Sequence, residues 1–200
     1  MPISHKHKLI FIHIPKCAGQ SIWKALDLDV DFEVKVNLDT LISFRSPVLQ
    51  HLLPKELKSY IDSETWNTYK KFTIIRDPYD RVVSDYHWLR ANYFASLTIT
   101  IPENFDDFLS MREEVVRGNK YSENMFYDHF YPMSYYFEEI EYDYVIRFEN
   151  IDKEFEVLNL PNKLLKINST VRGEFQLTQE QKDRIYELYK EDFIKFGYEK

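Results

Sequence analysis

A lysine, a glycine and a serine near the start of the chain are spaced as in a loop that could hold a phosphate group. Lys16, Gly19 and Ser21 follow a short apolar run at 9–13, which predicts a buried strand. Residues 21–26 have helical spacing with one apolar face. A strand, a tight loop and a helix in this order place unpartnered N–H groups and positive helix-dipole charge at the loop. An anion is therefore expected to bind there.

Each of these three residues has a physical role in such a loop. Gly19 lets the backbone approach an anion closely, Lys16 adds a positive charge, and Ser21 offers a hydroxyl group. The loop of nucleotide triphosphatases reads G-x-x-x-x-G-K-[ST], with the lysine after the second glycine. Here Lys16 precedes Gly19, so the pattern does not match that magnesium-dependent class.

A second anion-binding pattern follows a second predicted strand, at 72–75. Arg76 ends this strand, Asp77 is a candidate N-cap, and Pro78 suits the first position of a helix. Ser84 then falls in the second turn of that helix and can meet Arg76 at one anion. Arginine suits phosphate because its planar guanidinium can donate two parallel hydrogen bonds.

The segment 13–21, HIPKCAGQS, resembles the 5′-phosphosulfate loop of sulfotransferases that use 3′-phosphoadenosine-5′-phosphosulfate (PAPS), and in particular their carbohydrate branch. The family more often has threonine where Gln20 stands. An arginine followed by a serine eight positions later, as in Arg76 and Ser84, resembles the family's 3′-phosphate motif. The cofactor-binding residues that the resemblance implies are Lys16, Cys17, Ala18, Gly19, Gln20, Ser21, Arg76, Ser84 and, from an Arg-Gly loop found in other branches, Arg172.

The resemblance also implies an activity, the transfer of a sulfuryl group from PAPS to an acceptor hydroxyl with release of adenosine 3′,5′-bisphosphate (PAP). Lys16 would stabilise the leaving phosphate oxygen, and His51 matches the position of the family's catalytic base. An imidazole suits this task because its pKa lies near neutral pH. The carboxylates considered for orienting His51 are Asp39, Glu56 and Asp62.

The acceptor implied by the resemblance is a carbohydrate, and lipids, small alcohols and tyrosine side chains are the alternatives. Two other functions stay open, namely a nucleotide phosphotransferase on a related fold and a noncatalytic nucleotide-binding module. The linear sequence contains no cluster of ligands at metal spacing, so no metal is expected.

Other residues near the motifs have structural interpretations. Cys17 is the single cysteine, which excludes an internal disulfide and predicts a reducing compartment, with the thiol as a small buried filler. Helical spacing turns Arg81 away from the anion, so we expect a structural ion pair. Glu149 is expected to cap the helix that follows it. The family's His-x-x-Pro-Gln motif appears as His129 to Met133 without the glutamine, and this stretch is expected to form core and pocket wall.

Composition limits the class of protein. The chain has 200 residues, 44% hydrophobic and 30% charged, which fits one globular domain over 1–200. The net charge of −7 makes nucleic acid an unfavourable partner. No apolar run approaches the ~20 residues that span a bilayer, and the start lacks an apolar signal segment. We therefore expect a cytoplasmic protein without a membrane partner, and a flexible basic tail at 1–8.

Alternating strands and helices predict an α/β fold, with a parallel sheet of about four to five strands flanked by helices and phosphate sites at the C-terminal strand ends. Further strands are expected at 31–36 and 142–148, with another short apolar segment at 40–44. A helix is expected from Phe105 onward. A last helix should begin at a capping box of Thr178 and Gln181 and end at Gly197.

Overall fold

The computed structural model describes residues 3–26, 51–93, 100–124, 126–162, 164 and 175–200. Several expectations lie outside these residues. They are the strand at 31–36, the apolar segment at 40–44, the candidate carboxylate Asp39, and the Arg172-Gly173 pair.

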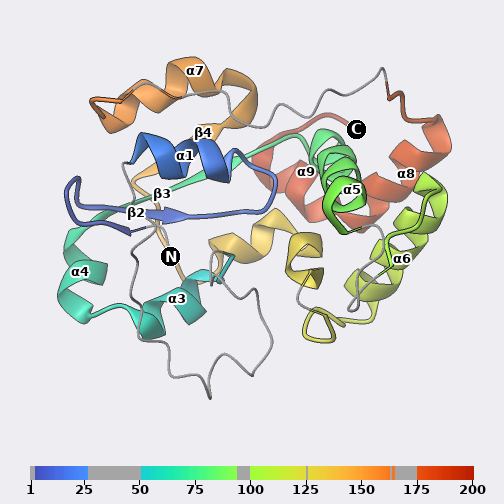
Figure 1. The fold of residues 1–200 in the computed structure, drawn as a ribbon, viewed down its shortest axis with the longest axis horizontal. Helices are drawn as coiled ribbons and strands as arrows, with labels where there is room; N and C mark the ends of the chain where they lie inside the picture. Colours follow the sequence, from blue (N-terminus) through green and yellow to red (C-terminus); the bar gives the residue numbers. More distant parts are fainter. Residues whose placement is uncertain (1–2, 27–50, 94–99, 125, 163, 165–174) are drawn as a thin grey trace.

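The described strands form one four-stranded, mostly parallel sheet, which confirms the predicted α/β class (Figure 1). Its members are β1 (Ile3–Ser4), β2 (Leu9–Ile12), β3 (Lys70–Ile75) and β4 (Tyr144–Arg147), in the order β1-β2-β3-β4. The pairs β2 with β3 and β3 with β4 are parallel, whereas β1 is antiparallel to β2.

The N-terminal residues differ from the expected flexible tail. Ile3 pairs with Ile10, Ser4 pairs with Leu9, and both Ile3 and Ser4 are buried. The reason is that Ile3 is the apolar residue of an otherwise polar segment and can cover the edge of β2 while the chain reverses. The charged residues of the segment then lie in the turn between β1 and β2.

The C-terminal ends of β2, β3 and β4 lie at one edge of the sheet. Ile12 is opposite Thr73, and Ile75 is opposite Arg147. Every residue of β2 is buried, so both faces of the sheet are covered there. The Thr73 hydroxyl donates to the Ile12 carbonyl at 2.8 Å, which ties the two central strands together beside the functional loops.

Helices surround this sheet, and local signals explain where several of them begin. Asp62 caps α4, Asn104 caps α6, and Thr178 with Gln181 forms the predicted capping box of α8. In the described part of the chain, no helix is long and apolar enough to cross a membrane. The α-helices are α1 (Gly19–Ala25), α3 (Pro54–Tyr60), α4 (Ser63–Thr68), α5 (Pro78–Tyr93), α6 (Phe105–Arg117), α7 (Ile151–Glu154), α8 (Gln179–Leu188) and α9 (Lys190–Phe196), and the short 3-10 helices are η1 (Tyr127–Phe130), η2 (Met133–Phe137), η3 (Phe148–Asn150) and η4 (Phe155–Leu158).

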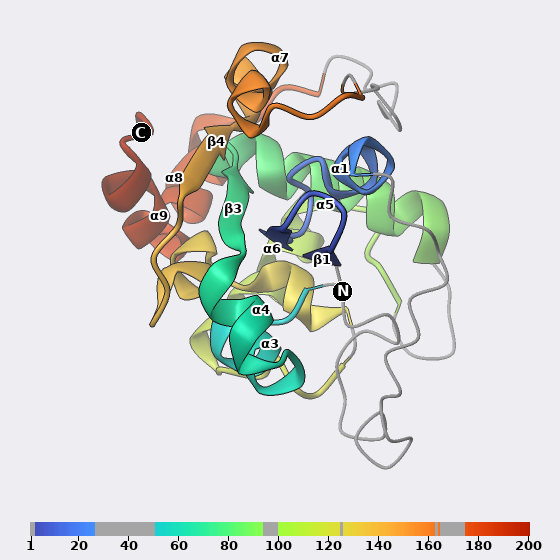
Figure 2. The ribbon, with the colours of Figure 1, turned by 90° about the vertical axis from the view of Figure 1, so that its left-hand side faces the viewer.

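The expected single C-terminal helix is two helices, α8 and α9, with a break at Tyr189. Gly197 ends α9 in the left-handed conformation, as predicted. Figures 1 and 2 show α8 and α9 close to α5 and α6, and η1 contacts α6 while η2 contacts α9. The break places the Tyr189 hydroxyl in contact with Phe130 of η1, and Asp192 of α9 accepts two backbone N–H groups of η2.

Candidate active site

The loop between β2 and α1 has the predicted position and an unusual backbone. Lys16 and Ala18 both have left-handed φ values, 66° and 61°, which cost non-glycine residues about 1–2 kcal/mol each. At Gly19 a Cβ atom would lie 1.8 Å from Nε2 of His13. Glycine is therefore required here because the His13 ring occupies the space of a side chain.

Not every residue of this loop is available in the way the resemblance implied. The Cys17 N–H donates to the Ile14 carbonyl at 3.3 Å, so in this structure it closes a turn instead of facing an anion. The Cys17 side chain is fully buried, and burial raises its pKa to about 11. Cys17 is thus a packed filler, as predicted. Ser21 is buried in α1, whereas Gln20 is exposed.

Arg76 lies against this loop, as expected from the end of β3. Its guanidinium donates to the Lys16 carbonyl at 3.1 Å, lies 3.5 Å from Asp80 and rests 4.1 Å above the Phe148 ring. The Nε atom of Arg76 is buried and has no hydrogen-bond partner among the residues that the structure describes. Ser84 is buried in the second turn of α5. The structure therefore brings Arg76 next to the loop and places a cationic N–H there that no other described residue accepts.

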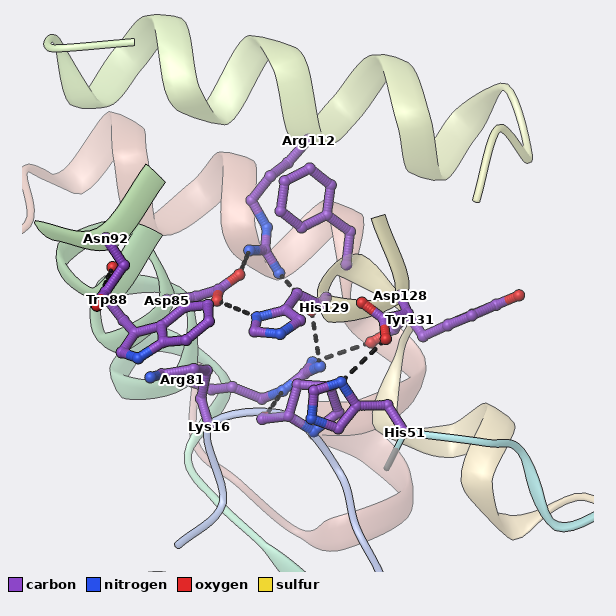
Figure 3. A network of polar contacts seen from close by, with 12 residues as sticks. Lys16, His51, Arg81, Asp85, Trp88, Asn92, Arg112, Asp128, His129 and Tyr131 are labelled. Carbon is purple, nitrogen blue, oxygen red and sulfur yellow. Dashed lines mark hydrogen bonds and ion pairs between the residues drawn. The ribbon is translucent and has the colours of Figure 1, made fainter. Parts of the chain in front are cut away.

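Arg81 is structural, but its partners are not the acidic group that we expected. The buried guanidinium donates to three backbone carbonyls, those of Pro15, His129 and Tyr131, at 3.0–3.1 Å. Pro15 lies in the lysine loop, and the other two carbonyls lie in and just after η1. Arg81 therefore joins the lysine loop to the segment carrying His129, as Figure 3 shows.

Glu149 caps a helix other than the one we expected. Its carboxylate accepts the backbone N–H of Asp77 at 2.7 Å and the hydroxyl of Tyr198 at 3.1 Å. Asp77 in turn accepts the Asp80 N–H at 3.0 Å, which confirms it as the N-cap of α5. Glu149 thus satisfies the N-terminus of α5, because β4 ends beside β3 and presents Glu149 there.

His51 is buried, and both its ring and its backbone carbonyl make hydrogen bonds. Its Nδ1 lies 2.9 Å from Oδ2 of Asp128, and its carbonyl accepts the Tyr136 hydroxyl at 3.2 Å. A carboxylate at Nδ1 favours the tautomer with its proton on that nitrogen, so Nε2 carries the lone pair. Burial lowers the pKa of His51, and the Asp128 carboxylate opposes part of that change. The ring is therefore neutral at pH 7 and can accept a proton.

The carboxylate that orients His51 was not among the candidates taken from the sequence. Glu56 accepts the Leu53 N–H at 2.8 Å and caps α3, while Asp62 accepts the Thr65 N–H at 2.8 Å and caps α4. Both are used by local helix ends, which compete with a distant imidazole. Asp128 lies 77 positions from His51, so no spacing rule could have paired them.

Three histidines form a row in this site. The ring centroids of His13 and His51 are 4.6 Å apart, and those of His51 and His129 are 4.9 Å apart. Burial, together with the neighbouring His51 and His129, holds the pKa of His13 well below its ordinary value. His13 is therefore neutral as well, and within the described part of the chain its buried Nδ1 has no hydrogen-bond partner.

His129 belongs to the site itself, beyond the core and pocket-wall role that we expected for it. Its Nδ1 lies 2.6 Å from Asp85, whose second oxygen accepts from Arg112 at 2.5 Å (Figure 3). The Trp88 ring stacks on His129 at 5.1 Å, and the Lys16 ammonium lies 4.7 Å from the centroid of Trp88. Lys16, Trp88 and His129 therefore form one continuous stack.

The charges of this stack are balanced by Asp85. Burial alone raises the pKa of Asp85, but the charge and hydrogen bond of His129 and the charge of Arg112 outweigh it, so the pKa lies below its usual range. Asp85 is thus a buried carboxylate anion. Its contact with Nδ1 fixes the orientation of the His129 ring and directs Nε2 away from Asp85.

A pocket of about 360 Å³ lies at the start of α5. Asp80, which pairs with Arg76, lines it together with Asp77, Tyr79, Val83, Phe175, Leu177 and Lys182. Two carboxylates make this pocket a poor place for phosphate groups. The favourable electrostatic position for a polyanion is the side of Arg76 that faces Lys16.

The amino-acid sequence as a whole was also compared with known proteins. A model of the sulfotransferase family matches residues 1–199. No curated protein and no solved structure matches the chain. The family match covers nearly the whole chain and includes both the lysine loop and the Arg76 segment, which the structure brings into contact. The chain therefore belongs to the sulfotransferase family.

Proposed function

We propose that this sulfotransferase moves the sulfuryl group from PAPS to an acceptor hydroxyl, with His51 as the general base. The observation that carries the proposal is the buried contact of 2.9 Å between His51 Nδ1 and Asp128. It fixes the ring and leaves Nε2 as the proton acceptor. The stack of Lys16, Trp88 and His129 adjoins this pair, which supports a single site for proton removal and for charge stabilisation.

The proposed step conserves atoms and charge. As the acceptor oxygen forms a bond to sulfur, its proton passes to Nε2 of His51, and the bond between sulfur and the 5′-phosphate oxygen breaks. Negative charge grows on that phosphate oxygen, where the Lys16 ammonium stabilises it. Asp128 stabilises the imidazolium that His51 becomes. A positioned base of this kind contributes about 10²–10⁴-fold to a reaction rate.

The donor is proposed to lie between the lysine loop and the start of α5. The unpartnered, buried Nε of Arg76 and its contact with the Lys16 carbonyl support a phosphate at this place. Gly19 and Ser21 would bind the 5′-phosphate, and Arg76 and Ser84 the 3′-phosphate. Lys16 reaches the leaving oxygen from the stack above Trp88.

The acceptor class that we propose is a carbohydrate. A sugar presents several hydroxyl groups to buried polar side chains and an apolar ring face to aromatic ones. The buried His51 and His129 rings, whose centroids are 4.9 Å apart, supply polar groups that can meet those hydroxyls.

The test separates donor binding from chemistry. PAP and ATP are titrated by calorimetry into the parent and into the Arg76→Ala and His51→Ala variants, and sulfate transfer from radiolabelled PAPS is measured on a panel of sugars, lipids and small alcohols. We expect tight PAP binding and poor ATP binding by the parent. Arg76→Ala should weaken PAP binding, whereas His51→Ala should bind PAP normally and lose activity by at least about 100-fold.

Arg117→Ala is the matched control, because Arg117 is exposed at the end of α6. It should change neither PAP binding nor activity. ATP binding with turnover in magnesium, and no PAP binding by the folded parent, would replace the proposal with a phosphotransferase. Normal PAP binding without transfer to any acceptor would indicate a noncatalytic nucleotide-binding protein.

A further inference from the structure

We propose that His51, Asp128 and His129 form a site for a divalent transition metal, with Zn²⁺ as its preferred ion, and that the bound ion blocks transfer. One ligand atom from each of these three residues lies within 4.8 Å of the other two, and all three side chains are buried. The metal binding does not depend on the proposed function. Only its inhibitory effect does.

The Asp128 carboxylate has one unsatisfied atom. Oδ2 of Asp128 contacts His51, but Oδ1 of the same carboxylate is buried without a hydrogen-bond partner among the described residues. Asp128 is only 2% exposed, and a buried anionic oxygen without a partner is costly. A cation placed between this carboxylate and the two imidazoles would remove that cost if both carboxylate oxygens contact it.

The ligand atoms also lie close to the spacing that a bound Zn²⁺ requires. Bonds of 2.0–2.1 Å to a tetrahedral Zn²⁺ place any two ligand atoms about 3.3 Å apart. His51 Nδ1 and Asp128 Oδ2 are 2.9 Å apart, close to that value already. The third ligand atom needs to move inward by ~1.5 Å at most from the 4.8 Å limit, which side-chain rotation can supply.

One of the ligands is also held in place by a carboxylate of its own. Ligating histidines usually donate their other N–H to a carboxylate, which fixes the ring and makes the ligand nitrogen more basic. His129 has this arrangement, because its Nδ1 is bonded to Asp85, and Asp85 is held by Arg112. Nε2 of His129 is thereby left as the ligand atom, in an orientation that does not depend on the metal.

The set of ligands selects the class of ion. Two imidazole nitrogens and one carboxylate oxygen suit Zn²⁺ and its neighbours Co²⁺ and Ni²⁺, whereas Mg²⁺ and Ca²⁺ prefer oxygen ligands alone. Three protein ligands leave one coordination position open. The nearby cations Lys16 and Arg81 oppose a divalent ion, so we expect reversible binding that a chelator removes.

The metal changes the chemistry of His51 directly. Coordination through Nδ1 leaves the imidazole proton on Nε2, and the base loses the lone pair that would receive the acceptor's proton. Zn²⁺ should therefore lower the transfer rate without displacing PAP from Arg76.

The test uses the full chain without an affinity tag. Zn²⁺ is titrated by calorimetry in a non-coordinating buffer, with Mg²⁺ as the comparison ion, and Co²⁺ binding is followed by its visible absorption. We expect one Zn²⁺ per chain, no measurable Mg²⁺ binding, and an absorption spectrum typical of low-coordinate Co²⁺. Asp128→Asn and His129→Gln should each weaken Zn²⁺ binding at least about tenfold.

The matched control is the double variant His5→Ala/His7→Ala, which removes the histidines of the N-terminal segment. It should bind Zn²⁺ like the parent. Loss of binding in this control, or unchanged binding in folded Asp128→Asn and His129→Gln variants, would overturn the site. If those variants do not fold, a six-coordinate Co²⁺ spectrum of the parent would also overturn the site. Zn²⁺ binding at the three residues with full activity would overturn the inhibition alone.

Discussion

At the scale of single residues, the chemistry depends on which nitrogen of each imidazole a carboxylate holds. Asp128 holds Nδ1 of His51 and Asp85 holds Nδ1 of His129, so both rings keep Nε2 for other partners. Burial then favours the neutral ring at His51. Asp128 raises the pKa of His51, and removing its carboxylate tests this effect.

We expect Asp128→Asn to lower kcat and to move the acid limb of the pH profile to lower pH. The shift follows because the carboxylate raises the pKa of His51, and without it burial lowers that pKa further. Losing a hydrogen bond to a charged group costs about 1.5–3 kcal/mol, or about 10- to 100-fold in rate. The measurement is kcat against pH with saturating donor.

Asp62→Asn is the control for this prediction, since Asp62 caps α4 and asparagine is an equally good cap. Its profile should match that of the parent. An acid limb that moves to higher pH in Asp128→Asn would contradict the role given to Asp128.

At the scale of elements, the lysine loop and His51 are coupled through one ring. His13 follows β2, stacks on Phe11 and meets His51 edge to face at 4.6 Å. The other side of its ring occupies the space above Gly19. The start of α1 can therefore hold its position only while residue 19 has no side chain or residue 13 has a small one.

We expect Gly19→Ala to abolish PAP binding and to lower the melting temperature, because the new methyl group and the His13 ring cannot share the same space. Adding His13→Ala to it should restore PAP binding in part, since the smaller residue makes room. PAP calorimetry and thermal melts of both variants test this coupling.

Gly197→Ala gives the control. This glycine has a left-handed φ of 65°, which would strain an alanine, but a Cβ there has 3.9 Å of room. The variant should lose about 1–2 kcal/mol of stability and keep PAP affinity. A double variant no better than Gly19→Ala alone would show that the clash with His13 is not the cause.

At the scale of the whole molecule, one buried arginine joins the C-terminal helices to the site. Arg112 of α6 is fully buried and donates to Asp85 of α5 and to the Tyr189 hydroxyl between α8 and α9. The Tyr189 hydroxyl donates a hydrogen bond to the carbonyl of Phe130, next to His129. Helices far apart in the sequence thus orient His129 through this chain of contacts.

We expect Arg112→Leu to lower the free energy of unfolding by about 3–5 kcal/mol, because it leaves the Asp85 anion buried without its arginine. Urea denaturation measures this change. Arg117→Leu, on the exposed face of the same helix, should stay within about 0.5 kcal/mol of the parent. Equal stabilities for the two variants would show that Arg112 does not neutralise Asp85.

Local signals in the sequence predicted strands and helix caps wherever one segment contains both partners of an interaction. The strand before the lysine loop, the cap at Asp77 and the capping box at Thr178 were predicted and are present. Helices α3 and α4 were not predicted, although Pro54 at the start of one and Asp62 at the cap of the other are ordinary signals.

The sequence by itself determined that the chain is a sulfotransferase with an α/β fold, because the lysine loop and the Arg76 segment are contiguous motifs. Only the tertiary structure decided which groups act on the histidines. Asp128 is 77 positions from His51, and Asp85 is 44 positions from His129. Such pairs form when the parallel strands and the helices around them bring distant segments together, and a linear pattern contains no distance across the fold.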